Sequence, residues 1–195
     1  MIAAVVLAAG ASTRMGEPKA LLRRADGRSY VEAIVETARA GGCDEIVVVL
    51  GPPHGEAIRA ALPAGVRAAW NGEPERGMLS SVQAGLAAVA GAASPPRAVE
   101  AALIWPVDIP FVEAATVRTL VTQDGTIVVP VHHGRGGHPL RVARAHFDEI
   151  ATLDPARGLK ALVDAHAAAV IRLPVDDRGV LVDVDTPEDY ARTRP

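Results

Sequence analysis

The sequence predicts an α/β fold, with a mostly parallel sheet and helices on both of its faces. Short apolar runs alternate along the chain with amphipathic stretches of helical spacing, which is the pattern of β-α-β units. The apolar runs are rich in Val, Ile and Ala and carry few charges, as expected for strands that are covered on both faces. A hydrophobic content of 49% is ample for the core of such a fold, and 195 residues suit one domain that spans residues 1–195.

Most of these elements begin or end at residues that typically start or stop regular structure. Strands are expected at 2–7, 45–50, 66–70, 101–107, 126–131, 170–173 and 180–182. Helices are expected at 30–40, 55–62, 79–90, 113–121, 144–150, 159–166 and from 187 onward, and a flexible surface link at 91–96. Ser29 suits the N-cap of the first helix, which the pair Gly41-Gly42 ends. Thr186 suits the N-cap of the last helix, with Pro187 at its first position.

Composition and charge exclude several classes of function. A net charge of −3 gives no electrostatic case for binding nucleic acid or an anionic membrane surface. The amino-terminal apolar run has no basic region before it, as a signal peptide would, and no apolar stretch approaches the roughly 18 residues of a transmembrane helix. The single cysteine, Cys43, cannot form an internal disulfide, and we expect a buried filler in a reducing compartment. We therefore expect a cytoplasmic protein without nucleic-acid or membrane partners.

The stretch 8–19, directly after the first expected strand, combines small residues with two cations. Gly10 and Gly16 let the backbone turn sharply and approach a ligand closely. Successive main-chain N–H groups in such a loop can form an anion-binding concavity, to which Arg14 and Lys19 add positive charge. The stretch therefore favours binding of a nucleoside triphosphate, with an ordinary strand-to-helix turn as the alternative.

The spacing within this stretch excludes two common phosphate-binding motifs. A P-loop requires G-x-x-x-x-G-K-[ST], whereas here five residues separate Gly10 from Gly16 and Lys19 comes three residues later. The dinucleotide fingerprint G-x-G-x-x-G is absent too. Lys19 is one of only two lysines beside 18 arginines, which favours a specific role for its compact ammonium, such as contact with a phosphate oxygen.

Carboxylates near two other expected elements indicate a metal site. Asp108 follows the apolar strand expected at 101–107, where burial of a lone charge would be costly. A Mg²⁺ ion would offset that cost, because it prefers carboxylate, water and phosphate oxygens. A cap for the following helix is the alternative. Asp183 and Asp185 form a D-x-D pair before the last helix, and metal binding and helix capping explain the pair equally well.

A third group of candidates follows the strand expected at 66–70. Gly77, Ser80 and Ser81 lie where a helix begins, so free N–H groups and hydroxyls there could meet a ribose, a base or a phosphate. Capping of that helix explains the two serines as well. Asn71 is ambiguous in the same way, as a turn residue or a base contact. The expected nucleotide contacts are thus Leu7, Ala8, Ala9, Gly10, Ser12, Arg14, Lys19, Asn71, Gly77, Ser80 and Ser81.

The loop 132–138 is rich in histidine and glycine. Three histidines here, His132, His133 and His138, raise the possibility of zinc, but their spacing matches no H-E-x-x-H or zinc-finger pattern and no cysteine is near. A mobile substrate loop is the favoured interpretation. Arg135, Gly137 and His138 are its candidates for contact with an anionic group.

The stretch from Leu7 to Leu22 resembles the signature loop of the nucleotidyltransferases related to molybdopterin guanylyl- and cytidylyltransferases. Four further segments fall in the order found in that family, and together they extend the resemblance from residue 7 to residue 189. These segments are 77–86 (Gly-Met-Leu-Ser-Ser-Val-Gln-Ala-Gly-Leu), 106–110 (Pro-Val-Asp-Ile-Pro), 137–139 (Gly-His-Pro) and 183–189 (Asp-Val-Asp-Thr-Pro-Glu-Asp). The chain departs from the common patterns at Trp105 and at 155–158.

The resemblance implies a Rossmann-like, three-layer fold of the nucleotide-diphospho-sugar transferase type, with a nucleoside triphosphate and Mg²⁺ bound at the carboxyl edge of the sheet. It implies roles by matching position: Ala9 and Gly10 near the base and phosphates, Arg14 and Lys19 on the triphosphate, Ser80 or Ser81 by the nucleoside, and Asp108 and Asp185 as metal ligands. The catalytic residues would be Arg14, Lys19 and Asp108. The Ala8-Ala9-Gly10 form and the Gly-His-Pro segment resemble the cytidylyl branch.

The expected activity is therefore transfer of a nucleoside monophosphate, from CTP rather than GTP, to the phosphate of molybdopterin. Pyrophosphate would be released, and the chain would make transient contact with a molybdenum enzyme or its chaperone. One alternative is transfer to a sugar phosphate or another phosphorylated metabolite. Another is a non-catalytic nucleotide-binding accessory protein of a molybdenum enzyme.

Overall fold

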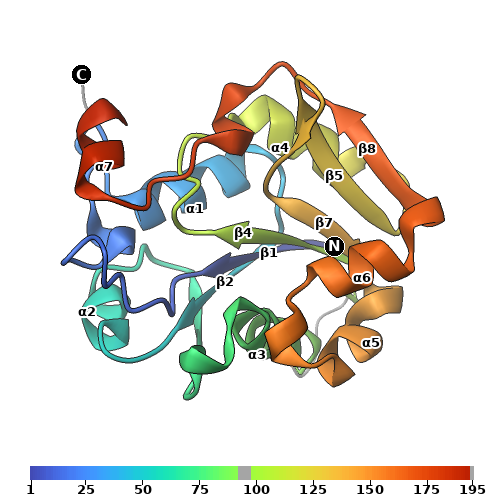
Figure 1. The fold of residues 1–195 in the computed structure, drawn as a ribbon, viewed down its shortest axis with the longest axis horizontal. Coiled ribbons are helices and arrows are strands. Elements are labelled where there is room, and N and C mark those ends of the chain that lie inside the picture. Colours follow the sequence, from blue (N-terminus) through green and yellow to red (C-terminus); the bar gives the residue numbers. More distant parts are fainter. Residues whose placement is uncertain (92–97, 194–195) are drawn as a thin grey trace.

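The computed structural model describes residues 1–91 and 98–193, and these residues form one sheet of eight strands (Figure 1). The strand order is β3-β2-β1-β4-β7-β5-β6, and β8 pairs with β5. Strands β1 to β4 are parallel, as are β5 and β8, whereas β7 runs antiparallel to both of its neighbours. The strands are β1 (Ile2–Leu7), β2 (Glu45–Leu50), β3 (Arg67–Trp70), β4 (Ala101–Pro106), β5 (Ile127–His132), β6 (Arg135–Gly136), β7 (Leu140–Ala143) and β8 (Val170–Pro174).

Helices cover both faces of the sheet, as the sequence predicts. One hydrophobic core joins the side of β1 that carries Ala4 and Val6 to α1 (Tyr30–Ala40), α2 (Gly55–Ala60) and α4 (Ala114–Thr122). The second core joins the opposite side of β1, with Ala3 and Val5, to α3 (Met78–Ala90), α5 (Phe147–Thr152) and α6 (Lys160–Ala165). In Figure 1, α3, α5 and α6 lie together on one side of the sheet, and α1 and α4 lie on the other. The last helix, α7, spans Pro187–Thr193.

The expected caps of the first and last helices are confirmed. At α1, Ser29 Oγ accepts a hydrogen bond from the Glu32 N–H, and the Glu32 carboxylate accepts one from the Ser29 N–H at 2.7 Å, so both groups of a capping box are present. At α7, the Asp189 N–H donates to Thr186 Oγ1 at 3.2 Å, and the Asp189 carboxylate accepts from the Thr186 N–H at 3.0 Å. These reciprocal bonds fix where each helix begins.

Several sequence-based expectations need correction or fall outside the described chain. The predicted strand at 180–182 is wrong, because Arg178–Leu181 form a 3-10 turn. The buried Asp177 carboxylate accepts from the Gly179 N–H at 2.8 Å and from Thr116 Oγ1 at 2.7 Å, which holds this segment in a turn against α4. The surface link expected at 91–96 lies outside the described residues except for Gly91, so that expectation stays a prediction.

Strand β7 was not foreseen, and it occupies a central place between β4 and β5. The chain runs along β5, turns through 132–138, and returns as β7, so this loop lies at the carboxyl end of β5. The segment is short and carries Arg141 at a buried position, which obscures the apolar pattern of a strand. The Arg141 guanidinium donates to the Gly125 carbonyl, and this contact satisfies part of the buried charge.

The side chain of Cys43 and the lengths of the helices bear on two expectations from composition. Cys43 is buried, and burial raises the pKa of its thiol to about 12, so the side chain stays protonated and acts as a filler. In the described ranges, no helix is long and apolar enough to cross a membrane.

Gly85 sets how closely α3 approaches the sheet, and we predict that Gly85→Ala destabilises the protein. A Cβ there would lie 2.3 Å from Val5 Cγ1 and 2.9 Å from Val49 Cγ2, both of which belong to fully buried side chains. Overpacking of this kind costs about 1–3 kcal/mol, which outweighs the gain of about 1 kcal/mol in helix propensity.

Thermal unfolding of the variant would measure this effect, with an expected fall in Tm of about 2–4 °C per kcal/mol. Gly72→Ala is the matched control, because a Cβ at Gly72 meets nothing within 4 Å. An unchanged or higher Tm for Gly85→Ala would contradict the prediction.

Candidate functional site

A cavity of about 290 Å³ opens at the carboxyl edge of the sheet, where β1 and β4 end. This is the place at which open α/β sheets generally bind ligands. The residues that line it are Leu7, Ala8, Ala9, Gly10, Ser12, Thr13, Arg14, Lys19, Ala20, Ile58, Pro74, Met78, Ser81, Pro106, Val107, Asp108 and Asp185. The cavity thus brings together segments that lie almost 180 residues apart along the chain.

Ser12 organises the loop between β1 and the 3-10 turn Lys19–Leu21. Its backbone has φ of +52°, and its carbonyl accepts hydrogen bonds from the N–H groups of Met15 and Gly16, each at 3.0 Å. Its Oγ accepts from the Lys19 N–H at 3.1 Å. The loop therefore closes on itself around Ser12, and this closure fixes where the side chain of Lys19 starts.

The Lys19 ammonium lies between two carboxylates. Its Nζ donates to Asp108 Oδ2 at 3.0 Å and also contacts Asp185 Oδ1, while Arg14 Nη2 lies 2.7 Å from Asp185 Oδ2. Burial alone would lower the pKa of Lys19, but the charge of Asp108 and the hydrogen bonds to both carboxylates outweigh it and raise that pKa. The hydrogen bond from Lys19 lowers the pKa of Asp185. Lys19 has only 13% of its side chain exposed, whereas Arg14 has 67% and is open to solvent.

A backbone hydrogen bond holds the two acidic segments side by side. The Val184 N–H donates to the Asp108 carbonyl at 3.0 Å, which brings both members of the D-x-D pair to the end of β4. One carboxylate oxygen from each of Asp108, Asp183 and Asp185 lies within 4.8 Å of the other two. Burial, with the charges of Asp108 and Asp185, raises the pKa of Asp183 to about 6. An all-oxygen donor set of this kind fits a hard divalent cation such as Mg²⁺ or Mn²⁺.

Trp105 supports the turn that carries Asp108. The indole is fully buried, and its Nε1–H donates to the Ile109 carbonyl at 2.9 Å, across the Pro106–Ile109 turn. Trp105 stands out in the sequence as a departure from the family pattern. Its hydrogen bond stabilises the turn that carries Asp108, and we call this contact the Trp105 brace.

The polar residues at the start of α3 form a network of their own. Asn71 Nδ2 donates to Ser80 Oγ at 2.8 Å and to Ser81 Oγ at 2.9 Å, and Ser80 Oγ donates to the Gly77 carbonyl at 2.7 Å. Ser81 lines the cavity, whereas Asn71, Gly77 and Ser80 do not. These side chains are thus engaged in fixing the end of β3 against α3, and Ser81 alone of the four faces the cavity.

None of the three expected substrate-loop residues lines this cavity, although His138 lies close enough to Asp108 to feel its charge. Arg135 lines a neighbouring open cleft of about 820 Å³, which Asp183 also lines. Gly137 packs tightly against Val180, because a Cβ there would lie 2.3 Å from the Val180 carbonyl oxygen. His138 is largely buried: desolvation lowers its pKa, and its Nδ1 has no hydrogen-bond partner in the described residues. The structure therefore does not bring Arg135, Gly137 and His138 together in the lining of this cavity.

Several lining residues were missed from the sequence. Pro106 and Val107 stand at the end of a predicted strand, so their position at the carboxyl edge was a usable signal. Ile58 comes from α2 and Pro74 from a turn, and neither carries a polar group that would have marked it. Met78 is 60% exposed, which marks an apolar contact surface, but the sequence alone does not show that exposure.

Residues 4–170 match the family model described as the MobA-like NTP transferase domain. The chain belongs to this family. It is 34% identical to the nicotine blue oxidoreductase of Paenarthrobacter nicotinovorans, over 98% of this chain and 95% of that protein. It is 31% identical to a probable molybdenum cofactor guanylyltransferase of Opitutus terrae, over 99% and 95%, and 25% identical to the molybdenum cofactor cytidylyltransferase of Escherichia coli, over 95% and 92%.

Solved structures of the family share the fold. The crystal structure of Rv0371c from Mycobacterium tuberculosis superimposes with a TM-score of 0.84 at 34% identity, over 98% of this chain and 96% of that one. A structure of Rv0371c described as a complex with manganese gives a TM-score of 0.78 at 31% identity, over 98% and 97%. The Rossmann-like fold of the nucleotide-diphospho-sugar transferase type, expected from the sequence, is confirmed.

We predict that Lys19→Met destabilises the protein by about 1–2 kcal/mol at neutral pH, between the cost of breaking an exposed ion pair and that of breaking a buried one. The reason is that Asp108 and Asp185 would remain close together without the ammonium between them. Urea unfolding in the absence of nucleotide and divalent ions measures the change.

Lys160→Met is the matched control, because Lys160 is the second lysine of the chain and pairs with Asp164 at the surface. Its free energy of unfolding should change by less than about 0.5 kcal/mol. If both substitutions changed the free energy of unfolding equally, the ammonium of Lys19 would not stabilise the protein by compensating Asp108 and Asp185.

Proposed function

We propose that the chain transfers a nucleoside monophosphate from a nucleoside triphosphate to the phosphate of molybdopterin and releases pyrophosphate. The observation that carries the proposal is the pairing of Arg14 and Lys19 with a cluster of carboxylates at one wall of the cavity. Cations suit the phosphates of the nucleotide, and the carboxylates suit the divalent ion that accompanies a triphosphate. Family membership and the guanylyl- and cytidylyltransferase relatives support the same reaction class.

The triphosphate would lie along the loop that follows β1. Ala9 and Gly10 line the cavity, where main-chain N–H groups would meet phosphate oxygens, and the side chains of Arg14 and Lys19 would add positive charge. Ser81 lines the cavity at the start of α3, which supports its assignment to the nucleoside in this proposal. Arg14 is mostly exposed and pairs with Asp185, whereas Lys19 is largely buried and pairs with both Asp108 and Asp185.

Asp108 and Asp185 would hold a divalent ion, Mg²⁺ in our proposal, and Asp183 lies close enough to join them. When bound, such an ion supplies positive charge beside the phosphates. The manganese complex of the Rv0371c structure supports a divalent ion in this family.

The chemistry asks little covalent work of the protein. An oxygen of the acceptor phosphate attacks the α-phosphorus in line, the bond from that phosphorus to the bridging oxygen breaks, and pyrophosphate leaves with the electron pair. An acceptor that is already an ionised phosphate needs no strong general base. Arg14 and Lys19 contribute by orienting the triphosphate and by compensating the charge that develops on the leaving pyrophosphate.

We infer that CTP is the preferred nucleotide. The support is the Ala8-Ala9-Gly10 turn, which resembles the cytidylyl branch and lines the cavity. Relatives named for guanylyl and for cytidylyl transfer are both similar to this chain, so the preference needs a direct test. We further propose that the chain makes transient contact with a molybdenum enzyme or its chaperone, since these would receive the product.

A nucleotide panel tests the reaction. Pyrophosphate release is measured with CTP, GTP, ATP and UTP, each with and without molybdopterin and with Mg²⁺ or Mn²⁺. We expect release that requires both molybdopterin and the divalent ion, with CTP at least ~10-fold faster than GTP. Release with a sugar phosphate in place of molybdopterin would move the assignment to another acceptor. Tight nucleotide binding without release with any acceptor would favour an accessory protein, and absence of both would refute the assignment.

We predict that Asp108→Ala lowers the metal-dependent turnover by at least ~10²-fold, because it removes a principal electrostatic group of the site. Asp164→Ala is the matched control, since Asp164 is an exposed carboxylate paired with Lys160 and does not line the cavity. Near-normal turnover of Asp108→Ala would remove Asp108 from the machinery. Thermal unfolding of both variants separates a loss of chemistry from a loss of fold.

A further inference from the structure

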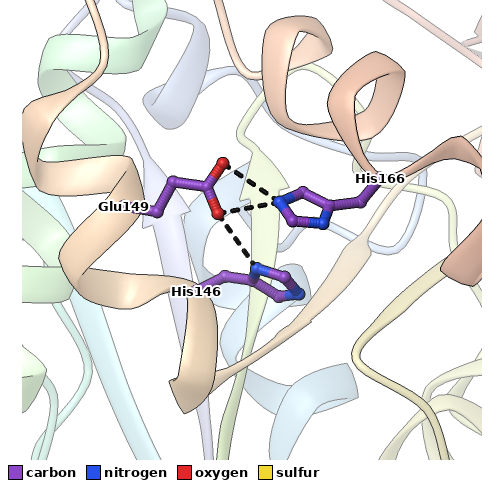
Figure 2. A group of neighbouring side chains, drawn as sticks. All are labelled: His146, Glu149 and His166. Carbon is purple, nitrogen blue, oxygen red and sulfur yellow. Dashed lines mark hydrogen bonds and ion pairs between the residues drawn. The ribbon is translucent and has the colours of Figure 1, made fainter.

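A second group of metal-binding side chains lies outside the nucleotide cavity (Figure 2). His146, Glu149 and His166, here called the His-Glu cluster, come from the helical segments that pack beside α3. None of the three lines the nucleotide cavity. One potential ligand atom from each residue lies within 4.8 Å of the other two.

The cluster draws its side chains from two separate segments, the start of α5 and the end of α6. His146 ends the 3-10 turn Arg144–His146 and Glu149 lies in α5, so their i,i+3 spacing places both side chains on one face. His166 directly follows α6 and reaches the same carboxylate from a separate element. The arrangement therefore joins α5 to α6 through side chains rather than through backbone pairing.

The distances within the cluster are within about 0.8 Å of those between ligands of one metal ion. His166 Nε2 lies 3.0 Å from Glu149 Oε1 and 2.8 Å from Oε2, and His146 Nδ1 lies 3.3 Å from Oε2. A tetrahedral zinc ion with ligands at about 2.0–2.2 Å separates neighbouring ligand atoms by about 3.3–3.6 Å. Small side-chain rotations would thus convert these contacts into coordination.

Hydrogen bonds can link these groups, but the convergence of the ligand atoms also suits a metal ion. His166 Nε2 lies within 3.0 Å of both oxygens of Glu149, an arrangement that suits either a three-centre hydrogen bond or a shared ion. His146 is buried, and its Nε2 has no hydrogen-bond partner among the residues described. The polar contact that orients this ring is therefore the one between its Nδ1 and Glu149. Both imidazoles converge on one carboxylate, with their rings 4.5 Å apart and 61° from parallel.

We propose that the His-Glu cluster binds Zn²⁺ with His146 Nδ1, Glu149 and His166 Nε2 as ligands. Two imidazoles and one carboxylate are a donor set that zinc favours, and Glu149 and His166 are partly exposed, so water can complete the coordination. The all-oxygen set at Asp108, Asp183 and Asp185 suits a harder ion, so the two sites differ in chemistry.

The bound ion would act as a cross-link between α5 and α6. Each of these helices has only six residues, which is shorter than helices that are stable alone. Buried apolar residues of both helices, such as Ile150 and Leu162, cover the face of the sheet that α3 also covers. A metal that binds the folded chain would hold this cover in place and raise the melting temperature.

The experiment measures Zn²⁺ binding to the full chain after treatment with a chelator, by competition with a chromophoric chelator and by calorimetry. We expect one strong site in the wild type, weakened at least ~100-fold in His166→Ala and in Glu149→Gln, because loss of a ligand should exceed the ~10–100-fold cost of losing an outer contact. Zn²⁺ should raise the Tm of the wild type and leave that of Glu149→Gln unchanged.

Two controls separate this site from others. His132→Ala/His133→Ala removes a different pair of neighbouring imidazoles, with rings 4.2 Å apart, and should keep the zinc site. Asp108→Asn/Asp185→Asn removes carboxylates of the nucleotide site and should keep it too. No strong zinc binding by the wild type, or unchanged binding by His166→Ala and Glu149→Gln, would overturn the proposal.

Discussion

The Lys19 ammonium lies between two carboxylates from distant parts of the chain, and the arrangement of the nucleotide site depends on this charge compensation. Asp108 lies in the turn after the buried strand β4, and Asp185 precedes the last helix. Both carboxylates contact Lys19, so the two would repel each other without a cation between them. The loop closed by Ser12 sets where Lys19 begins, and the Trp105 brace holds the turn with Asp108. The loop around Ser12 and the hydrogen bond of Trp105 therefore both help to keep the Lys19 ammonium beside the two carboxylates.

The sequence predicted the parts of the fold and site that follow from local patterns. Because parallel strands end at one edge of a sheet, the loop 8–19 and Asp108 could be placed together before any coordinates were known. β7 could not be predicted, since its stability comes from pairing with two other strands and not from its own pattern. The His-Glu cluster escaped notice for a similar reason: His146 and Glu149 show helical spacing, but nothing local indicates that His166 meets them.

Family membership accounts for the fold and the class of reaction, but relatives named for guanylyl and for cytidylyl transfer both match this chain, so membership does not fix the nucleotide. The turn at Pro155–Arg157 lies against the start of α3, because the Pro155 carbonyl oxygen lies 3.1 Å from where a Cβ at Gly77 would be. That contact brings a segment in which this sequence departs from the common family pattern to within one residue of Met78, which lines the cavity.

The central position of β7 also determines how the chain can be divided. Residues up to the end of β4 contain the loop 8–19 and Asp108, yet β4 pairs on one side with β7, which comes about 35 residues later in the chain. A fragment that stopped before β5 would leave one side of this wholly buried strand as an open hydrogen-bonding edge, a template for self-association. The two halves of the sequence are therefore interdependent, and limited proteolysis between them should yield fragments that remain associated.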